Sequence, residues 1–208
     1  IIKWNTTWLF QLNATKYSWA KSLYQVMIWN FWVPEKVSGL WDDAVQFKEA
    51  LTEDERRAYK WILSFLIFLD SIQTVNLPNF NDYITAPEVN LILSIQAYQE
   101  AIHSQSYATM LETIVASHER DEIYYFWRTD KHLLERNEFI GWIYQDFIDD
   151  PSDENYFRGI IWNFLLESIY FYNGFAFFDT LADQGKMVAT DRMINFIRRD
   201  ELTHVTID

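Results

Sequence analysis

The feature that most restricts the fold of this chain is a Glu-x-x-His spacing that occurs twice. Glu100 precedes His103 in the segment AYQEAIHSQSY, and Glu201 precedes His204 in RRDELTH. Residues three apart share one face of an α-helix, so each segment can direct a carboxylate and an imidazole at one point. Two such helices, with one carboxylate from each of two further helices, provide the ligand set of a dinuclear metal site in a helix bundle.

Two acidic residues have the sequence context that the remaining ligands require. Asp70 lies in WILSFLIFLDSIQ and Glu167 in IIWNFLLESIYFYNGF, two apolar segments with no Lys or Arg within one turn of the acid. Burial of an isolated carboxylate is costly unless it is paired or binds a metal. Oxygen-rich ligation with one imidazole per ion suits iron or manganese. The predicted ligands of two divalent ions are Asp70, Glu100, His103, Glu167, Glu201 and His204.

The composition favours one domain made of long helices. The 208 residues include only five Gly and four Pro, and half are hydrophobic, so the chain can bury a large core. The absence of Cys excludes disulfides, zinc–thiolate sites, iron–sulfur ligation and a thiol nucleophile. A net charge of −13 argues against binding nucleic acid through its phosphates. We therefore predict an all-α protein with no nucleic-acid partner.

We expect no secretory or membrane segment. The N-terminal IIKWNTTWLF lacks the basic region, apolar run and cleavage site of a signal peptide. The most membrane-like stretch, residues 160–181, contains Glu167, Asn173 and Asp179 and has no flanking basic clusters, which is typical of a buried bundle helix. The expected location is the cytoplasm, without a membrane partner.

In the first half of the chain, prolines, a glycine and one capping box mark the predicted helix boundaries. The expected segments are a helix over residues 17–31 before Pro34, a connection containing Gly39, Asp42 and Asp43, and a helix from the Thr52–Glu55 capping box to about residue 76. Pro78 is expected to break that helix and to be followed by a loop.

In the second half, the same signals predict an outer layer and two further long helices. Pro87 suits the first turn of a helix that extends to about residue 115. The remaining expected segments are one or two outer helices within residues 117–146, a turn at residues 149–153, a helix that carries Glu167 and ends near Gly185, and a last helix capped by Thr190 and Asp191.

Tyr107 lies one turn after His103 and therefore on the same helix face as the predicted ligands. The alternative for this residue is an ordinary core tyrosine with a hydrogen bond. Three apolar residues at helical spacing from Glu167 and Glu201 can wall a dry pocket that protects a radical from quenching. They are Phe171, Phe175 and Ile197.

Asp200 precedes the ligand Glu201 and can accept a hydrogen bond from the N–H of a ligand His. The alternative is a surface acid beside Arg198 and Arg199. The other two histidines, His118 and His132, lie among charged residues, so we expect them to be solvated.

Taken together, these segments resemble the radical-generating small (beta) subunit of class I ribonucleotide reductases. The resemblance covers nearly all of the chain from about residue 17 onward and implies a ferritin-like helix bundle. It also implies a division into an N-terminal arm, residues 1–16, and a ferritin-like domain, residues 17–208. The matching segments are FWVPEKV at 31–37, LDSIQ at 69–73, EAIHSQSY at 100–107, LESIYFYNGF at 166–175 and RRDELTH at 198–204.

The resemblance gives each candidate residue a role. One metal ion is held by Asp70, Glu100 and His103, and the other by Glu167, Glu201 and His204. Tyr107 carries the radical, inside a pocket of Phe171, Phe175 and Ile197. Trp32 begins the radical-transfer path, through Asp200 and His103.

The implied activity is that of a ribonucleoside-diphosphate reductase beta subunit, an oxidoreductase of deoxyribonucleotide biosynthesis. Two iron ions, with manganese as the alternative, activate oxygen to generate and store a tyrosyl radical. The large (alpha) subunit uses this radical to reduce ribonucleotides to deoxyribonucleotides, as the source of DNA precursors. The family also implies a homodimer.

The chain departs from the family in two places. The family continues beyond the last ligand His through further helices to a tail that docks on the large subunit, whereas this chain stops four residues after His204. We therefore expect a truncated, split or intervening-sequence-interrupted product. The N-terminal arm, with Trp4, Trp8 and Phe10, matches no family motif.

Three other functions are compatible with parts of the pattern. They are a ligand-binding oxidase of the same fold, a non-catalytic iron-binding or storage module, and a purely structural bundle. Neither the oxidase nor the storage module needs Tyr107, Asp200 and Trp32 together. A structural bundle leaves Asp70 and Glu167 buried without a counter-charge.

Overall fold

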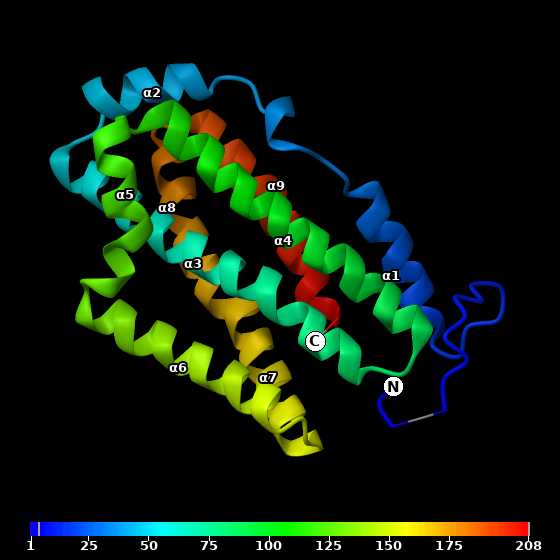
Figure 1. Ribbon diagram of the computed structural model, residues 1–208. Helices are drawn as coiled ribbons and strands as arrows, with labels where there is room; N and C mark the ends of the chain where they lie inside the picture. Colours follow the sequence, from blue (N-terminus) through cyan, green and yellow to red (C-terminus); the bar gives the residue numbers. More distant parts are fainter. Residues whose placement is uncertain (4, 208) are drawn as a thin grey trace.

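The computed structural model describes residues 1–3 and 5–207, and most of these residues are helical (Figure 1). In this part of the chain the only β pairing is an isolated bridge between Ile2 and Ile84. The prediction of an all-α protein is confirmed. The elements are α1 (Ser18–Trp29), η1 (Pro34–Lys36), α2 (Leu40–Glu49), α3 (Glu53–Tyr83), α4 (Pro87–Ile114), α5 (Ser117–Tyr125), η2 (Phe126–Arg128), α6 (Lys131–Asp149), α7 (Asp153–Leu165), η3 (Leu166–Tyr170), α8 (Phe171–Asp183) and α9 (Val188–Ile207).

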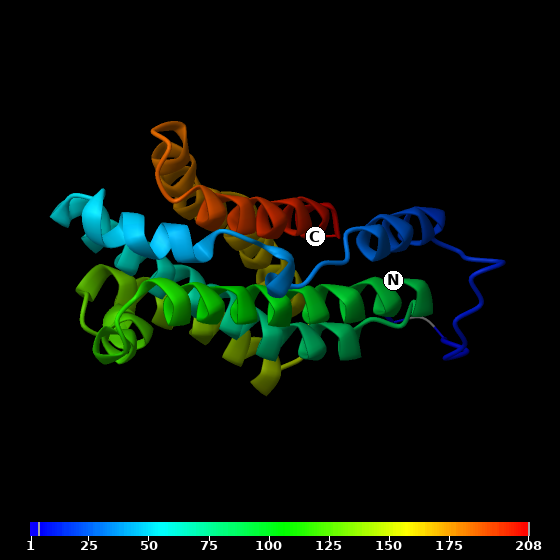
Figure 2. The ribbon, with the colours of Figure 1, turned by 90° about the horizontal axis from the view of Figure 1, so that it is seen from above.

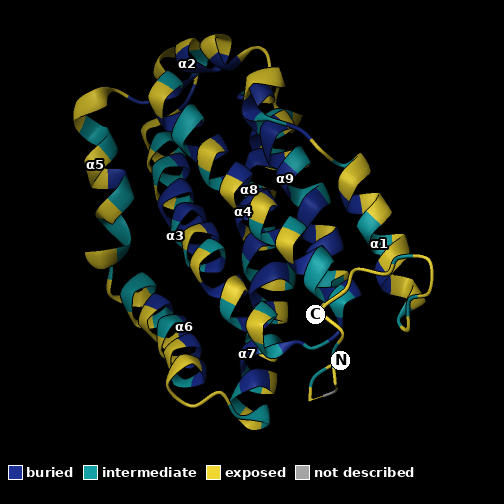
Figure 3. Ribbon diagram, turned by 45° about the vertical axis from the view of Figure 1, so that its right-hand side comes forward, coloured by how far each residue is buried: buried dark blue, intermediate teal, exposed yellow. Residues whose placement is uncertain are grey.

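Four long helical segments form the core of the bundle: α3, α4, the continuous run α7–η3–α8, and α9. α3 packs along α4. α9 packs against α4, η3 and α8, and α8 also packs against α3. α1 and α2 follow one another along α4 (Figure 2). Buried residues lie on the inner faces of the core helices, whereas α5 and α6 expose their outer faces (Figure 3). The predicted outer layer of one or two helices is therefore present, as the two helices α5 and α6.

The capping box at the start of α3 forms as predicted. The Thr52 hydroxyl accepts a hydrogen bond from the Glu55 backbone N–H (3.2 Å), and the Glu55 carboxylate accepts one from the Thr52 N–H (2.7 Å). These two bonds satisfy backbone donors that a helix otherwise leaves free at its first turn. Pro87 opens α4, also as predicted.

The prediction that Pro78 breaks the helix is wrong, because α3 continues through it to Tyr83. A proline removes one helical hydrogen bond, but tertiary packing can outweigh that loss. Phe80 is 1% exposed, and its ring contacts those of Tyr144, Phe147 and Tyr156. These aromatic contacts require the turn after the proline to remain helical.

Asp42 and Asp43 do not lie in a connection, which corrects a second expectation. Both belong to the first turn of α2, where carboxylates interact favourably with the positive end of the helix dipole. Gly39 precedes this turn with a φ of 99°, and a Cβ there would lie 3.2 Å from the Ala189 Cβ. The left-handed conformation and the close approach both favour glycine.

The cap of α9 comes from another helix, which corrects a third expectation. α9 begins at Val188, so Thr190 and Asp191 lie inside it. The buried Asp43 carboxylate accepts hydrogen bonds from the backbone N–H groups of Ala189 (3.3 Å) and Thr190 (2.6 Å). Asp43 of α2 thus caps the N-terminus of α9, a role that was predicted for Thr190 and Asp191.

The N-terminal residues lie outside the helices. Residues 5–17 contain no helix, and Trp8 and Phe10 are 71% and 58% exposed. The Ile1 carbonyl accepts a hydrogen bond from the Thr85 backbone N–H (2.9 Å), which ties the chain start to the α3–α4 connection. Trp4, the remaining aromatic residue of the predicted arm, lies outside the described residues, as does Asp208 at the end of the predicted domain.

Among the described helices, α3 alone is long and apolar enough to cross a membrane, by length and composition. More than half of its apolar window (56%) is buried inside the bundle. The stretch that looked most membrane-like in the sequence, residues 160–181, is instead divided among α7, η3 and α8.

A pair of glycines provides a stability test of the packing of α3 against α6 and α7. A Cβ at Gly159 would lie 2.7 Å from the Phe80 ring, whereas a Cβ at Gly141 would meet Ile72 at 3.9 Å, an ordinary contact. We expect Gly159→Ala to destabilise the protein by about 1–3 kcal/mol through overpacking. Gly141→Ala should instead stabilise it by up to about 1 kcal/mol through helix propensity. Urea unfolding followed by circular dichroism measures both, and equal effects would contradict the packing described for Phe80.

Candidate metal centre

The four core segments bring all the predicted ligands to one place in the middle of the bundle. Each of these side chains is 0% exposed. The contributions are Asp70 from α3, Glu100 and His103 from α4, Glu167 from η3, and Glu201 and His204 from α9.

The ligand atoms form two overlapping groups. In each group one donor atom from every residue lies within 4.8 Å of the others. The first group is Asp70, Glu100, His103 and Glu201, and the second is Glu100, Glu167, Glu201 and His204. Glu100 and Glu201 belong to both groups, whereas the family resemblance gives each of them to a single ion.

Each imidazole directs its Nδ1 atom at the carboxylates. His103 Nδ1 lies 3.2 Å from Asp70 Oδ1 and 3.0 Å from Glu201 Oε1. His204 Nδ1 lies 3.2 Å from Glu100 Oε1 and 3.1 Å from Glu201 Oε2. Two imidazole nitrogens and the carboxylate oxygens therefore converge on a common space.

The donor set fits divalent cations. Asp70 Oδ2 and Glu167 Oε2 are buried and have no hydrogen-bond partner among the described residues. In this part of the chain, the ion-pair partners of the four carboxylates are histidines rather than Lys or Arg. Buried acids with free lone pairs and no fixed counter-charge require a cation or a proton.

The protonation equilibria of the cluster are strongly perturbed. Burial raises the pKa of Asp70 and of Glu167 well above the usual range, and neighbouring carboxylates raise both further. Burial lowers the pKa of His103 and His204, but the surrounding carboxylates outweigh it, so both values are raised. Burial also raises the pKa of Glu201, as it does that of Asp70 and Glu167. Interactions with His204 and other partners outweigh this effect, so the pKa of Glu201 is lowered overall. The metal-free cluster therefore carries protons on its histidines at neutral pH.

Loading the cluster with a divalent ion should release protons. The raised pKa values of His103 and His204 mean that both imidazoles carry protons at neutral pH, and ligands must be deprotonated. Lowering the pH adds protons that compete with the metal, so the apparent affinity should fall as the pH falls. Calorimetric titration with Mn²⁺ in buffers of different ionisation enthalpy measures the release. A heat of binding that is independent of the buffer would contradict this prediction.

Glu167 lies in a π-helical turn, η3, which interrupts the helix predicted to run to Gly185. The extra residue of a π turn shifts the side chains that follow it around the helix axis. Such turns are frequent at functional sites. Neither the apolar periodicity nor the composition of this segment reveals the π turn.

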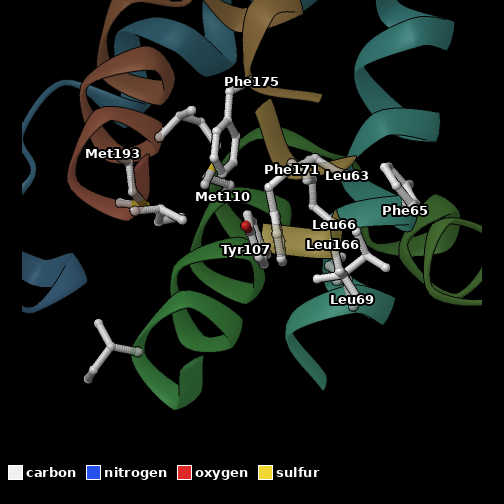
Figure 4. Close-up of a cluster of buried hydrophobic side chains, with 14 of the residues drawn as sticks. Leu63, Phe65, Leu66, Leu69, Tyr107, Met110, Leu166, Phe171, Phe175 and Met193 are labelled. Carbon is white, nitrogen blue, oxygen red and sulfur yellow. The ribbon is translucent and has the colours of Figure 1, made fainter. Parts of the chain in front are cut away.

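Tyr107 lies beside the ligand cluster in a fully buried apolar pocket. Phe171, Phe175 and Ile197 are 0% exposed, and the two phenyl rings stack with centroids 5.8 Å apart. Figure 4 shows the Tyr107 ring among Phe171, Phe175 and Met110. Burial raises the pKa of the Tyr107 hydroxyl well above its usual value, and nearby Asp70 and Glu201 raise it further. The phenol is therefore neutral and shielded from water.

A short polar contact chain joins the cluster to Trp32. The indole Nε1–H donates to Asp200 Oδ2 (2.7 Å), and the same oxygen lies 3.2 Å from His103 Nε2. Trp32 is 5% exposed and Asp200 is fully buried, so Asp200 is not the surface acid of the alternative interpretation. Its carboxylate orients the His103 ring so that Nδ1 faces the other ligands.

A set of buried amides surrounds the cluster and was not predicted from the sequence. Gln99 Oε1 lies 3.0 Å from His204 Nε2, and a hydrogen bond there orients the second imidazole as Asp200 orients the first. The available signal was amides in otherwise apolar helices, one turn from the ligands: Gln73, Gln96, Gln99 and Asn163. By contrast, His118 and His132 are exposed, as predicted.

A helix bundle whose core segments direct four carboxylates and two histidines at one buried point defines a ferritin-like protein with a dinuclear metal site. Residues 9–207 match the sequence model of the family described as "Ribonucleotide reductase, small chain". The chain belongs to this family, as its motifs suggested.

Curated relatives and a solved structure agree with this membership. The chain is 51% identical over 201 residues to the ribonucleoside-diphosphate reductase subunit beta of Treponema pallidum, which covers 97% of the chain and 57% of the relative. It is 48% identical over 206 residues to the subunit beta of Aquifex aeolicus, covering 99% and 30%. The ribonucleotide reductase R2 subunit from Clostridium botulinum is 51% identical with a TM-score of 0.96, covering 100% of the chain and 65% of that structure.

The chain thus spans about a third to two thirds of the length of these relatives. More distant structures share the fold alone. An R2-like ligand-binding oxidase with a Mn/Fe cofactor is 17% identical with a TM-score of 0.80, covering 96% of the chain and 75% of that structure.

Proposed function

We propose that this chain is the radical-generating subunit of a ribonucleoside-diphosphate reductase. The observation that carries the proposal is the joint placement of the ligand cluster, the walled Tyr107 and the contact from Trp32 through Asp200 to His103. A storage or structural bundle needs neither of the last two features. In this role residues 1–16 are an arm, residues 17–208 are one ferritin-like domain, and the protein works in the cytoplasm.

The six cluster residues would hold two iron ions, with manganese as the alternative. Asp70 and His103 lie at one end of the cluster, Glu167 and His204 at the other, and Glu100 and Glu201 between them. Oxygen-rich sites with one imidazole per ion favour these metals over zinc or copper. When bound and oxidised by oxygen, the ions supply the potential that removes an electron from a tyrosine.

The chain's own residues position the reaction and keep it dry. Tyr107 holds the radical, and its buried hydroxyl has no hydrogen-bond partner among the described residues. Phe171, Phe175 and Ile197 exclude water and small reductants from the phenol oxygen. The Asp200 Oδ2 atom contacts two proton donors, the Trp32 Nε1–H and the His103 ring. Apart from the redox chemistry of the metal, the protein contributes binding, orientation and electrostatics.

An electron paramagnetic resonance experiment tests this proposal. The protein is loaded with ferrous iron without oxygen and then exposed to oxygen. A narrow signal near the free-electron value, with two irons per chain, would support the radical subunit. Two bound irons without this narrow signal, and no narrow radical signal after manganese loading and oxidation either, would favour the oxidase. No bound metal would refute the proposal.

The proposed partner is the large catalytic subunit, which receives the radical by way of Trp32. The proposed assembly also contains two copies of this chain, in keeping with its family. Sedimentation of the chain alone, and then with the large subunit of the same host, tests both associations.

Replacing Trp32 by Phe should separate radical formation from radical use. The substitution removes the Nε1–H that Asp200 binds at 2.7 Å, replaces no predicted ligand, and keeps an aromatic ring beside His103. We therefore expect normal metal content and a normal Tyr107 signal, with nucleotide reduction by the assembled enzyme reduced to background. Phe196, which stacks on Trp32 with centroids 5.1 Å apart, provides the control, because Phe196→Leu keeps the indole N–H. Full turnover in Trp32→Phe would contradict the proposed path.

A further inference from the structure

Glu167 is surrounded by buried amide side chains that are not themselves predicted ligands. Its Oε1 atom accepts hydrogen bonds from Gln73 Nε2 (2.7 Å), Gln96 Nε2 (3.4 Å) and Asn163 Nδ2 (3.4 Å). All three amides are 0% exposed. Charge-assisted bonds of this kind favour the anionic carboxylate and restrict its rotation. The second oxygen, Oε2, accepts none of these bonds and lies 3.7 Å from His204 Nδ1.

A buried phenol sets the direction of two of these amides. The Tyr144 hydroxyl donates toward Gln73 Oε1 (3.1 Å) and Asn163 Oδ1 (3.0 Å). Gln73 Nε2 also donates to Asn163 Oδ1. Because the amide oxygens face the hydroxyl, the amino groups must face Glu167. Tyr144 is 3% exposed and belongs to α6, outside the four core segments.

The opposite end of the cluster has no such support. Asp70 Oδ1 lies 3.2 Å from His103 Nδ1, and its Oδ2 has no hydrogen-bond partner among the described residues. The two terminal carboxylates of the site are therefore held differently. Among the described residues, Asp70 has no amide donor on either oxygen, whereas Glu167 has one oxygen engaged by amide donors.

We propose that Gln73, Gln96, Asn163 and Tyr144 are positioning residues that hold Glu167 with Oε2 alone directed at the ions. This inference rests on the proposed metal site. The ion beside Glu167 and His204 then depends on the amide group, and the ion beside Asp70 and His103 does not. The two positions therefore differ in affinity for chemical reasons that lie outside the ligand set.

Anaerobic Mn²⁺ titration of the full chain, with free Mn²⁺ read from its paramagnetic signal, tests the proposal. Glu167→Gln first identifies the binding step that belongs to the Glu167 end. In Gln73→Met we expect that same step to weaken about 10- to 100-fold, the range for outer-shell partners of metal ligands, while the other step is unchanged. Tyr144→Phe should weaken the same step by a smaller factor, because the amides remain but lose their orientation.

Asn76→Ala is the matched control. Asn76 is a buried amide three residues after Gln73 on α3, and its side chain has no hydrogen-bond partner among the described residues. Its replacement should leave both steps unchanged. If Gln73→Met does not fold, the titration of Tyr144→Phe tests the proposal, because this variant keeps the ring that packs on Phe80.

Each other outcome overturns the inference in a distinct way. Equal weakening of both steps in Gln73→Met would mean that the amides support the fold rather than Glu167. Two unchanged steps in both variants would mean that the amides do not position Glu167, and the proposed function would stand. A wild-type chain that binds no Mn²⁺ and no iron would refute the proposed function and this inference together.

Discussion

Replacing Tyr107 by Phe should abolish the radical signal while leaving two metal ions bound per chain. The phenyl ring keeps the packing against Phe171 and Phe175, so the change removes only the hydroxyl. A phenylalanine ring has no ionisable O–H, so it cannot lose a proton and an electron together as a phenol does. The signal should therefore fall to background, the largest effect expected of any single substitution here. Paramagnetic resonance after iron loading, combined with elemental analysis of the same sample, measures both quantities.

Tyr59→Phe provides the matched control for that experiment. Tyr59 is also 0% exposed, and its hydroxyl contacts Thr190 at 3.2 Å, away from the ligand cluster. Burial raises its pKa as well, so burial alone does not distinguish the two tyrosines. We expect a full signal in this variant. A loss of metal in Tyr107→Phe would show that the hydroxyl supports the site, and loss of signal in Tyr59→Phe would move the radical elsewhere.

Replacing Glu201 by Gln should remove both ions, whereas Glu167→Gln should remove one. Glu201 contributes a donor atom to both overlapping groups, with Oε1 near His103 and Oε2 near His204. Glu167 contributes only to the second group. Each replacement keeps the side-chain volume and removes the charge. Because loss of an outer-shell partner already costs about 10- to 100-fold in affinity, loss of a shared carboxylate should cost at least that much at both positions.

Metal stoichiometry by elemental analysis and Mn²⁺ titration would distinguish these two variants. A single ion retained in Glu201→Gln would favour the simpler division, in which Glu201 serves one ion only. Circular dichroism of the metal-free forms provides the control, since a helical apo protein shows that the loss lies in the site and not in the fold.

Much of this site could be predicted because helical periodicity is a local property of the sequence. The spacing of Glu100 and His103, repeated in Glu201 and His204, defines which side chains share a helix face. The apolar runs around Asp70 and Glu167 mark acids that must be buried and neutralised. These statements need no knowledge of which helices touch, and the structure buries all six residues together.

Helix boundaries were harder to predict from the sequence wherever a residue distant in the chain determines them. Pro78 lies inside α3 because Phe80 packs against Tyr144, Phe147 and Tyr156, two of them on α6 and one on α7. The start of α9 depends on Asp43 of α2, more than a hundred residues earlier. Local capping and breaking signals cannot report such contacts.

By itself, therefore, the sequence predicted the all-α class and the buried acids and histidines of the cluster, because helical spacing and apolar context are local properties. The family resemblance, and not spacing, connected Tyr107 with Phe171, Phe175 and Ile197. Only the tertiary structure decided that Glu100 and Glu201 are shared between the two ligand groups, because sharing depends on the distance between α4 and α9. The same holds for the amides around Glu167. Gln73, Gln96, Asn163 and Tyr144 come from different helices, and only their packing places one carboxylate oxygen among them.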